Sequence, residues 1–288
     1  MLLVTGATGL NGGAVVRQLS ARGVPVRALV RNRTKAADLA TLVGVEIVEG
    51  DMARPETLVG ALIGVERALL ISSSDPAMLE VQANFIDAAR GAGVRHVVKL
   101  SGVMPELESN FRFARMHAQI EQKLEASGMA FTHLRAGEFM QAYFRQVRSI
   151  VSQSAIRLPM ADARIASIDV DDIADVAATV LTEDGHAGQA YPLTGPDALS
   201  MTEVAAHLSA AIGKTVRYVD VSPQDYLAAN LAAGMPAYTA EALVELYAER
   251  RAGKESHVSR VAEKLLGRPP RSFKDFSKRH ATIFRGDR

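Results

Sequence analysis

The sequence predicts an α/β fold: a Rossmann-type, doubly wound parallel sheet with a smaller, mainly helical C-terminal lobe. Three observations support this. Short apolar runs alternate with amphipathic stretches through the first half, a glycine-rich turn joins the first run to the first helical pattern, and strand-like runs become rare near the C-terminus. Repeated strand–helix units of this kind favour right-handed crossovers and a parallel sheet.

Strand-like runs and helical segments alternate in the first half of the chain. The run Arg67–Ser72 is almost wholly apolar, as expected of a strand covered by helices on both faces. Pro55 opens its predicted helix, where a missing N–H costs little. The strands are expected at 2–5, 25–30, 45–48, 67–72, 96–100 and 130–134, and the helices from 14 onward and at 35–42, 55–62, 76–92 and 111–126. His96, at the start of its strand, is expected to be structural.

The second half is less regular. Residues 164–170 alternate like a strand, and 191–194 form a second, short one. Ser200 and Glu203 have the spacing of a capping box, which predicts a helix from there to residue 212. The remaining helices are expected at 171–181, 223–233, 236–252, 259–266 and 272–280.

These elements suggest two domains. Residues 1–150 would form the Rossmann domain, and the strands at about 156–170 and 190–194 would return to its sheet or edge. Residues 195–288 would form a helical lobe that covers the substrate. The basic segment 268–279, with its interleaved phenylalanines, is expected to be a docked amphipathic helix with a solvated face.

Composition excludes several classes of function. The 288 residues include no cysteine, which excludes disulfides, thiolate catalysis and cysteine metal sites. A formal net charge of +1 gives no reason to expect nucleic acid as a partner, and no apolar run approaches the ~20 residues of a membrane span. Met1 leads directly into a strand, without a signal sequence. We expect a cytoplasmic monomer or homodimer that binds a small molecule and no metal, nucleic acid or membrane.

Glycines follow the first strand at the spacing G-x-x-G-x-x-G, as Gly6, Gly9 and Gly12. A strand that turns sharply into a helix directs the free N–H groups and positive dipole end of that helix at one point, which suits a pyrophosphate. A Cβ there would block the turn, the phosphates or the packing of helix on strand. The position between a strand and a helix is the one that the dinucleotide fingerprint requires.

The end of the second predicted strand indicates which dinucleotide binds. An NAD site usually has an acid there, but this chain has Arg31, Arg33 and Lys35, which can pair with a 2′-phosphate. NADP(H) is therefore favoured, with NAD(H) as the alternative. Asp51, after the third strand, can bind the adenine amino group or cap the turn before Pro55.

Several motifs together resemble the NmrA-like atypical short-chain dehydrogenases, and most closely their bacterial quinone reductases and triphenylmethane dye reductases. The motifs are Thr5-Gly-Ala-Thr-Gly9, Arg31, Gly50-Asp51, Ile71–Ser74, His117-x-x-x-Glu121 and the segments 134–139, 168–173 and 191–196. The resemblance covers the chain to about residue 220, and the helical tail more loosely.

The resemblance implies a set of NADP(H) contacts. Arg31 would meet the 2′-phosphate, and Ser72 and Ser73 would lie along the ribose. The nicotinamide would be bordered by residues after the fifth and sixth strands, namely Ser101, Gly102, Ala136, Gly137 and Phe139. The pyrophosphate side would be held by Gly6, Thr8, Gly9, Leu10, Asn11 and Gly12, with Asp51 and Met52 also at the cofactor.

His117 and Glu121 occupy the places where relatives that act on alcohols or sugars have Tyr-x-x-x-Lys. The histidine is the catalytic candidate: it can bond the nicotinamide ribose or donate to the acceptor, with Glu121 orienting its ring. The alternative is an ordinary i,i+4 helix pair. Quinones and cationic dyes need little acid catalysis, so we expect NADPH-dependent hydride transfer to a quinone or a similar flat acceptor such as a dye, enone or imine. The alternative is a non-catalytic redox sensor that binds NADP(H).

Overall fold

The computed structural model describes residues 1–102 and 104–287, and the chain divides into two compact units. The first unit contains Met1–Leu107, Phe113–Arg135 and Val170–Pro192, and the second contains Glu108–Arg112, Ala136–Asp169 and Leu193–Arg288. Within the described residues, no helix combines the length and the apolar character that crossing a membrane requires.

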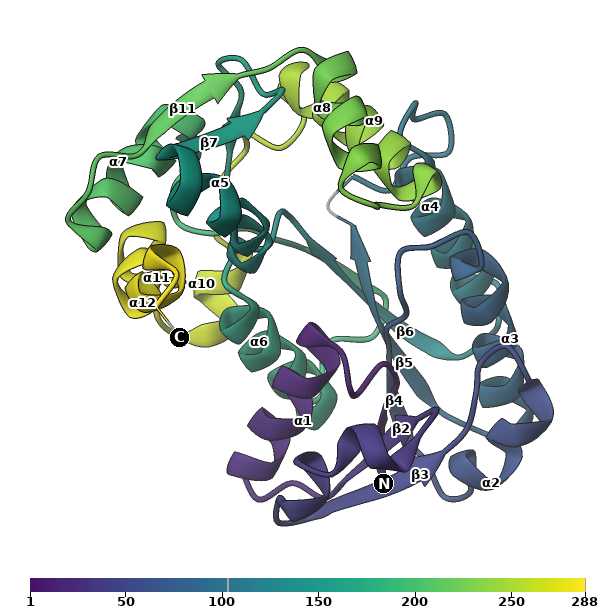
Figure 1. Cartoon of the computed structure of the whole chain (residues 1–288). Coiled ribbons are helices and arrows are strands. Elements are labelled where there is room, and N and C mark those ends of the chain that lie inside the picture. Colours follow the sequence, from purple (N-terminus) through teal and green to yellow (C-terminus); the bar gives the residue numbers. More distant parts are fainter. Residues whose placement is uncertain (103, 288) are drawn as a thin grey trace. The chain divides into compact units, whose positions relative to one another are not determined.

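A seven-stranded sheet forms the centre of the first unit, with the strand order β3-β2-β1-β4-β5-β6-β9 (Figure 1). The pairings β3–β2, β2–β1, β1–β4 and β4–β5 are parallel. The order reverses between β1 and β4, which is where ligands of doubly wound sheets bind. This confirms the predicted Rossmann-type fold. The strands are β1 Leu2–Val4, β2 Val26–Val30, β3 Val45–Glu49, β4 Arg67–Leu70, β5 His96–Gly102, β6 Ala130–Ala136 and β9 Gln189–Leu193.

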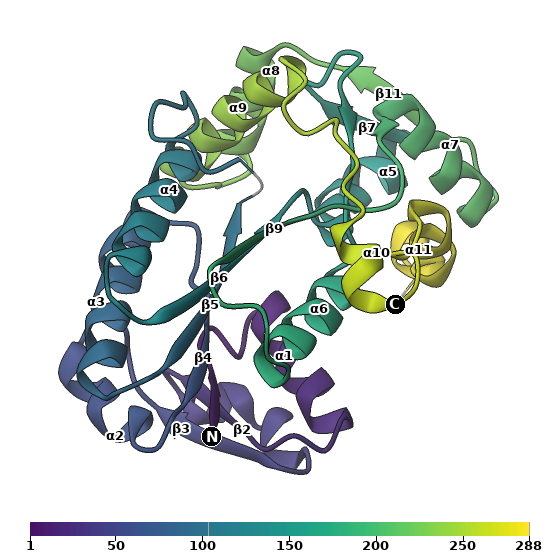
Figure 2. The same cartoon turned by 180° about the vertical axis from the view of Figure 1, so that it is seen from behind.

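Helices cover both faces of this sheet. Helices α1 (Leu10–Ala21) and α6 (Val170–Thr182) lie on one face, and α3 (Met78–Gly91) and α4 (Arg112–Glu125) lie with the short α2 (Leu58–Leu62) on the other (Figures 1 and 2). The two-sided cover explains why the central strands are apolar: Ala68, Leu69 and Leu70 of β4 are all buried.

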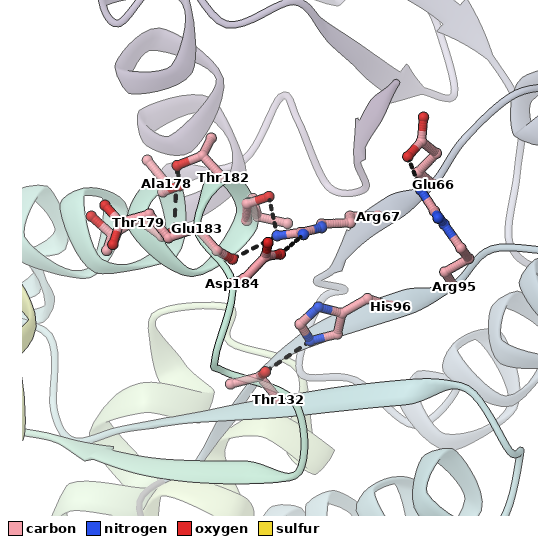
Figure 3. Close-up of polar contacts among 11 residues, drawn as sticks. Glu66, Arg67, Arg95, His96, Thr132, Ala178, Thr179, Thr182, Glu183 and Asp184 are labelled. Carbon is pink, nitrogen blue, oxygen red and sulfur yellow. Dashed lines mark hydrogen bonds and ion pairs between the residues drawn. The ribbon is translucent and has the colours of Figure 1, made fainter.

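Ion pairs and hydrogen bonds between polar side chains hold the amino ends of the central strands in place (Figure 3). Arg67 of β4 pairs with Asp184, beyond the end of α6. The Nε2 atom of His96 lies 2.8 Å from Oγ1 of Thr132, whose hydroxyl donates to the carbonyl of His186 at 2.6 Å. Burial lowers the pKa of His96 to about 4, and the charge of Arg67 acts in the same direction. His96 is therefore neutral and structural, at the edge opposite the carboxyl ends of the strands.

Helices and two small pairs of strands build the second unit. Strand β7 (Ala155–Leu158) pairs in parallel with β11 (Arg217–Asp220), and β8 (Arg164–Ile165) pairs antiparallel with β10 (Leu199–Ser200). The core contains Phe273, a residue of α11 that is 3% exposed. The helices are η4 Met140–Gln146, α5 Val147–Gln153, α7 Met201–Ile212, α8 Pro223–Ala232, α9 Ala237–Arg251, α10 Val261–Leu266, α11 Phe273–Arg279 and α12 Ala281–Arg285.

The strands expected at about 156–170 differ from the prediction. Neither β7 nor β8 belongs to the main sheet, because each pairs with a strand of the second unit. The apolar side chains of β7, such as Ile156, are buried in the core of that unit. The run 164–170 is a strand only to Ile165, since α6 begins at Val170. The strand expected at 190–194 is β9, at the edge of the main sheet.

The helix expected at 35–42 is instead two short 3₁₀ turns, Arg33–Ala36 and Leu39–Thr41, here η1 and η2. The side chain of Asn32 accepts from the N–H of Thr34 and fixes the first turn. A segment this short gains too few helical hydrogen bonds to offset nucleation. Helices from residue 223 onward are confirmed, and the phenylalanines of the basic segment are buried as expected of a docked helix.

Replacing Ser200 by alanine should lower the free energy of unfolding by about 1 kcal/mol, as is typical when an N-cap is lost. The Ser200 hydroxyl accepts from the N–H of Glu203 at 3.3 Å, and the Glu203 carboxylate accepts from the N–H of Ser200 at 2.8 Å, so both halves of the predicted capping box are present. Denaturant unfolding measures the change. Ser200→Thr, which keeps the hydroxyl, is the control, and equal stability of the alanine variant and the wild type would contradict the prediction.

Candidate functional site

The turn between β1 and α1 has the geometry of a phosphate cradle. Gly6 has a φ of +59°, and its carbonyl accepts from the N–H of Gly9 at 2.9 Å. Helix α1 begins at Leu10 without a side-chain cap, so the N–H groups of its first turn are available to an anion. A Cβ on Gly12 would lie only 2.3 Å from the carbonyl oxygen of Gly6. The turn therefore requires glycine at this position.

A cavity of about 520 Å³ lies at the carboxyl ends of β1, β2, β3 and β4, within the first unit. This volume is in the usual range for small-molecule sites. The Oδ1 atom of Asn11 is buried and has no hydrogen-bond partner among the described residues, so a bound ligand can supply the missing donor. The lining is Thr5, Gly6, Thr8–Gly12, Leu29–Arg31, Gly50–Ala53, Ile71–Ser73, Asp75, Ala77 and Val81.

Most of the cofactor contacts predicted in the first unit line this cavity. They are Gly6, Thr8, Gly9, Leu10, Asn11, Gly12, Arg31, Asp51, Met52, Ser72 and Ser73. Arg31 follows β2, and the acids of the lining, Asp51 and Asp75, belong to other segments. Three features therefore fit a dinucleotide with a 2′-phosphate: the glycine turn after β1, the unpaired Oδ1 atom of Asn11 and the cationic side chain at the end of β2.

Arg33 and Lys35, also predicted at the cofactor, are not among the residues that line the cavity. Both lie in the exposed η1 turn, where the N–H of Arg33 donates to the carboxylate of Glu49 at 3.2 Å. Asp51 caps its own turn, because its carboxylate accepts from the N–H of Ala53 at 3.0 Å. The same residue lines the cavity, so its two predicted roles are compatible.

A buried lysine lies in the neighbouring strand β5. Lys99 is completely buried, and its Nζ donates to Oγ of Ser101 at 3.0 Å and lies 2.8 Å from Nδ1 of His117. Burial lowers the pKa of Lys99 to about 7, although the nearby Glu121 carboxylate opposes the shift. The amine thus titrates near neutral pH, because its pKa lies far below that of an ordinary lysine.

His117 projects from α4 toward the carboxyl end of β5. A Cβ on Gly102 would lie 3.0 Å from Cδ2 of the imidazole, so this glycine leaves room for the ring. Burial lowers the pKa of His117 well below its usual range, and the charge on Lys99 lowers it further. The ring is therefore neutral. When Lys99 donates to Nδ1, the proton of the imidazole must be on Nε2.

Glu121 does not take the orienting role that the spacing predicts, because the partner of His117 Nδ1 is Lys99. Its carboxylate instead accepts from Arg135 of β6, with the shortest N–O distance 2.6 Å. Burial alone would raise the pKa of Glu121, but hydrogen bonds from Arg135 and Ser101 hold it below its ordinary value. The i,i+4 spacing puts Glu121 on the same face of α4 as His117, but the hydrogen-bond partner of Nδ1 is a lysine from another element.

One group of side chains in the described part of the chain has ligand atoms close enough for a metal ion: Glu121, Glu125 and His133, with those atoms within 4.8 Å of one another. Their contacts are those of an ion-pair network. Arg135 occupies the Glu121 carboxylate, and Nε2 of His133 lies 3.0 Å from Oε1 of Glu125. A guanidinium in contact with one ligand group disfavours a second cation.

Ala136, the last residue of β6, and the candidates that follow it belong to the second unit. Ala136 is buried, the N–H of Gly137 donates to the carbonyl of Leu193 at 3.0 Å, and Phe139 forms a β-bridge with Ile168. Between them, Glu138 pairs with Arg250, a guanidinium that is only 4% exposed. These backbone contacts fix the course of the segment, so any contact with a cofactor would come from an ordered chain.

Lys99 was not among the site residues predicted from the sequence, although its position in the chain indicates a buried polar group. A lysine stands in the middle of His96–Leu100, a run that was predicted to be a buried strand. Lysine is almost never fully buried without a partner, so a lysine in such a strand indicates a polar cluster. Its partner is distant in sequence and can be identified only from the packing of α4 on β5.

Lys99→Met should change how stability depends on pH. The folded-state pKa of about 7 lies below the ordinary value of 10.5, so between these values the unfolded wild-type chain binds more protons than the folded one. The buried charge destabilises the fold fully below about pH 7. This effect disappears as the pH rises from about 7 toward 10.5, the ordinary pKa of lysine. Wild-type stability should therefore increase relative to Lys99→Met across this window, as measured by denaturant unfolding at several pH values. A constant difference between the two proteins would contradict the assigned pKa.

The comparisons with known proteins agree with this geometry. A model of the NmrA-like family matches residues 1–276. The chain is 39% identical over 284 residues to NAD(P)H azoreductase of Xenophilus azovorans, covering 99% of both chains. It is 34% identical over 273 residues to quinone oxidoreductase 2 of Escherichia coli, covering 93% of this chain and 94% of that one.

Solved structures give the same result. The NADPH-dependent quinone oxidoreductase of Escherichia coli complexed with NADPH superposes with a TM-score of 0.89 at 32% identity, covering 97% of this chain and 99% of that one. Triphenylmethane reductase of Citrobacter sp. complexed with NADP(H) gives 0.88 at 31% identity, covering 98% and 100%. The resemblance inferred from the motifs is confirmed, and the chain belongs to the NmrA-like family.

Proposed function

We propose that this chain is an NADPH-dependent reductase that transfers hydride to a quinone, an azo compound or a similar flat electrophile. The observation that carries the proposal is that the glycine turn after β1 and the cationic end of β2 line one cavity. The relatives named as azoreductase, quinone oxidoreductase and triphenylmethane reductase support it, since each aligns with nearly the whole chain.

Different residues of the first unit bind different parts of the cofactor. The N–H groups at the start of α1 bind the pyrophosphate, and Arg31 pairs with the 2′-phosphate. Ser72 and Ser73, after β4, lie along the ribose. Ser101 and Gly102, the last two residues of β5, border the nicotinamide. Bound NADPH supplies the hydride, and the protein supplies position and the surrounding charges.

The chemistry of the His117 position selects the acceptor. A tyrosine and lysine pair is absent from this helix, and the imidazole that replaces the tyrosine is neutral. Such a group is a weak acid, adequate for the reduction of a quinone or azo compound but poor for reversible alcohol chemistry. A cationic dye needs no proton. The acceptors that fit are therefore electron-poor compounds that take up hydride without the help of a strong acid.

The direct test is NADPH oxidation by the purified protein against a panel of quinones, azo dyes and triarylmethyl dyes, with NADH in parallel. Turnover that depends on the acceptor and is faster with NADPH supports the proposal. Tight NADPH binding without turnover on any acceptor would refute it and favour a redox sensor.

Replacing Arg31 by serine should reduce the preference for NADPH over NADH by about ten- to a hundredfold, which is the loss expected for charge-assisted hydrogen bonds to one phosphate. The ratio of kcat/KM for the two cofactors measures it. Arg33→Ser is the matched control, because Arg33 has the same charge and a nearby position but does not line the cavity. An equal loss in both variants would show that the basic loop acts as a diffuse charge.

A further inference from the structure

We propose that Lys99 is a positioning residue for the reduction: its ammonium group holds His117 as the Nε2–H tautomer and replaces the proton that the imidazole gives to the acceptor. This inference rests on the proposed function. It adds a proton supply that neither the motif spacing nor the names of the relatives assign.

Two hydrogen bonds of Lys99 determine where the proton of the His117 ring lies. Lys99 is fully buried, and its known hydrogen-bond partners are Ser101 Oγ at 3.0 Å and His117 Nδ1 at 2.8 Å. An ammonium group has only donors, so Nδ1 of a ring that it contacts must accept. The ring's one proton is then on Nε2. A buried lysine kept only for packing would be replaced at lower cost by methionine.

Lys99 and His117 lie near the cavity, as a proton supply for the acceptor requires. Leu70 of β4 is the register partner of Lys99, and the cavity lining continues from the end of β4 with Ile71 and Ser72. The carboxyl ends of parallel strands lie at one edge of a sheet, so the end of β5 adjoins the edge that carries the cavity. His117 packs against Gly102 at that end of β5.

The charges around Lys99 keep its proton available. The titratable groups that face it are His117 and Glu121 of α4 and His133 and Arg135 of β6. Glu121 favours the ammonium form, Arg135 opposes it, and burial opposes it most strongly. The result is an amine that is partly protonated near neutral pH and can lose and regain a proton at little cost.

The relay delivers one proton for each hydride that is transferred. The acceptor gains a hydride from NADPH, with its electron pair, and one proton. Imidazole Nε2 gives this proton to the reduced acceptor's oxygen or nitrogen, and Nδ1 takes a proton from the Lys99 ammonium at the same time. Lys99 is left as a neutral amine and the ring as the Nδ1–H tautomer. After the product leaves, Nε2 takes a proton from water and Nδ1 returns its proton to Lys99, which restores the ammonium group and the Nε2–H ring. A triarylmethyl cation takes up hydride alone, so its reduction does not use this route.

The first measurement needs no turnover. Nitrogen-15 NMR of histidine-labelled protein, with His117 assigned by comparison with His117→Gln, reports which ring nitrogen holds the proton. We expect a neutral Nε2–H ring in the wild type between about pH 6 and about pH 7, where Lys99 still carries an ammonium group. In Lys99→Met the Nε2–H preference should be lost and the His117 pKa should rise, because the cationic neighbour is gone. An Nδ1–H ring in the wild type would overturn the proposal, whether or not the variant folds.

The second measurement compares two acceptors. Lys99→Met should lower kcat for a quinone by about tenfold or more, while the rate with a triarylmethyl dye changes little, because only the quinone needs a proton. The wild-type quinone rate should decline as the pH rises above about 7, and the variant should lack this decline. Lys123→Met, which removes a lysine of α4 that pairs with Asp87, should leave both rates unchanged.

Two kinetic results would overturn the proposal: equal losses for both acceptors in Lys99→Met, or no loss for the quinone. The double variant Lys99→Met/His117→Gln adds a further criterion. If Lys99 acts through His117, the double variant should be no slower with the quinone than His117→Gln alone. Additive losses would contradict this. If the wild type turns over no acceptor, the proposed function fails, and the NMR result still decides whether Lys99 sets the tautomer.

Discussion

The close approach of α1 to the turn after β1 is the constraint on which the rest of the site depends. A Cβ on Gly12 would be 2.3 Å from the carbonyl of Gly6, so the helix can start at this distance only with glycine. Thr5 ties the same turn to the next strand, since its hydroxyl donates to the carbonyl of Ile71 at 2.7 Å. The start of the helix and the end of β4 are therefore fixed relative to each other, and the cavity lies between them.

A cluster of buried polar and charged side chains lies next to the cavity, at the carboxyl end of β5. In an otherwise apolar strand, Lys99 connects Ser101 with His117, while Glu121 and Arg135 form the adjoining ion pair. A cluster of this kind is costly to bury unless its members satisfy one another. In the proposed relay, the amine of lowered pKa and the neutral imidazole pass one proton to the acceptor near neutral pH.

The parts of the fold that were predicted correctly are those with a local signal. The glycine turn, the alternating strands and helices and the capping box at Ser200 are each determined by residues close together in sequence. The assignment of β7 to the main sheet was wrong because pairing depends on β11, about sixty residues later. The partner of His117 was misassigned for the same reason. Spacing places Glu121 on its face of α4, but only the packing of α4 against β5 brings Lys99 to the ring.

The proposed phosphate site is tested most directly by titrating the isotope-labelled protein with NADPH and following its backbone amides by NMR. We expect the largest shifts at the amides of Gly9, Leu10, Asn11 and Gly12, the proposed pyrophosphate site, with a further shift at Arg31 that NADH does not produce. Saturable binding that leaves these amides unmoved would contradict the claim that the turn after β1 is the phosphate site.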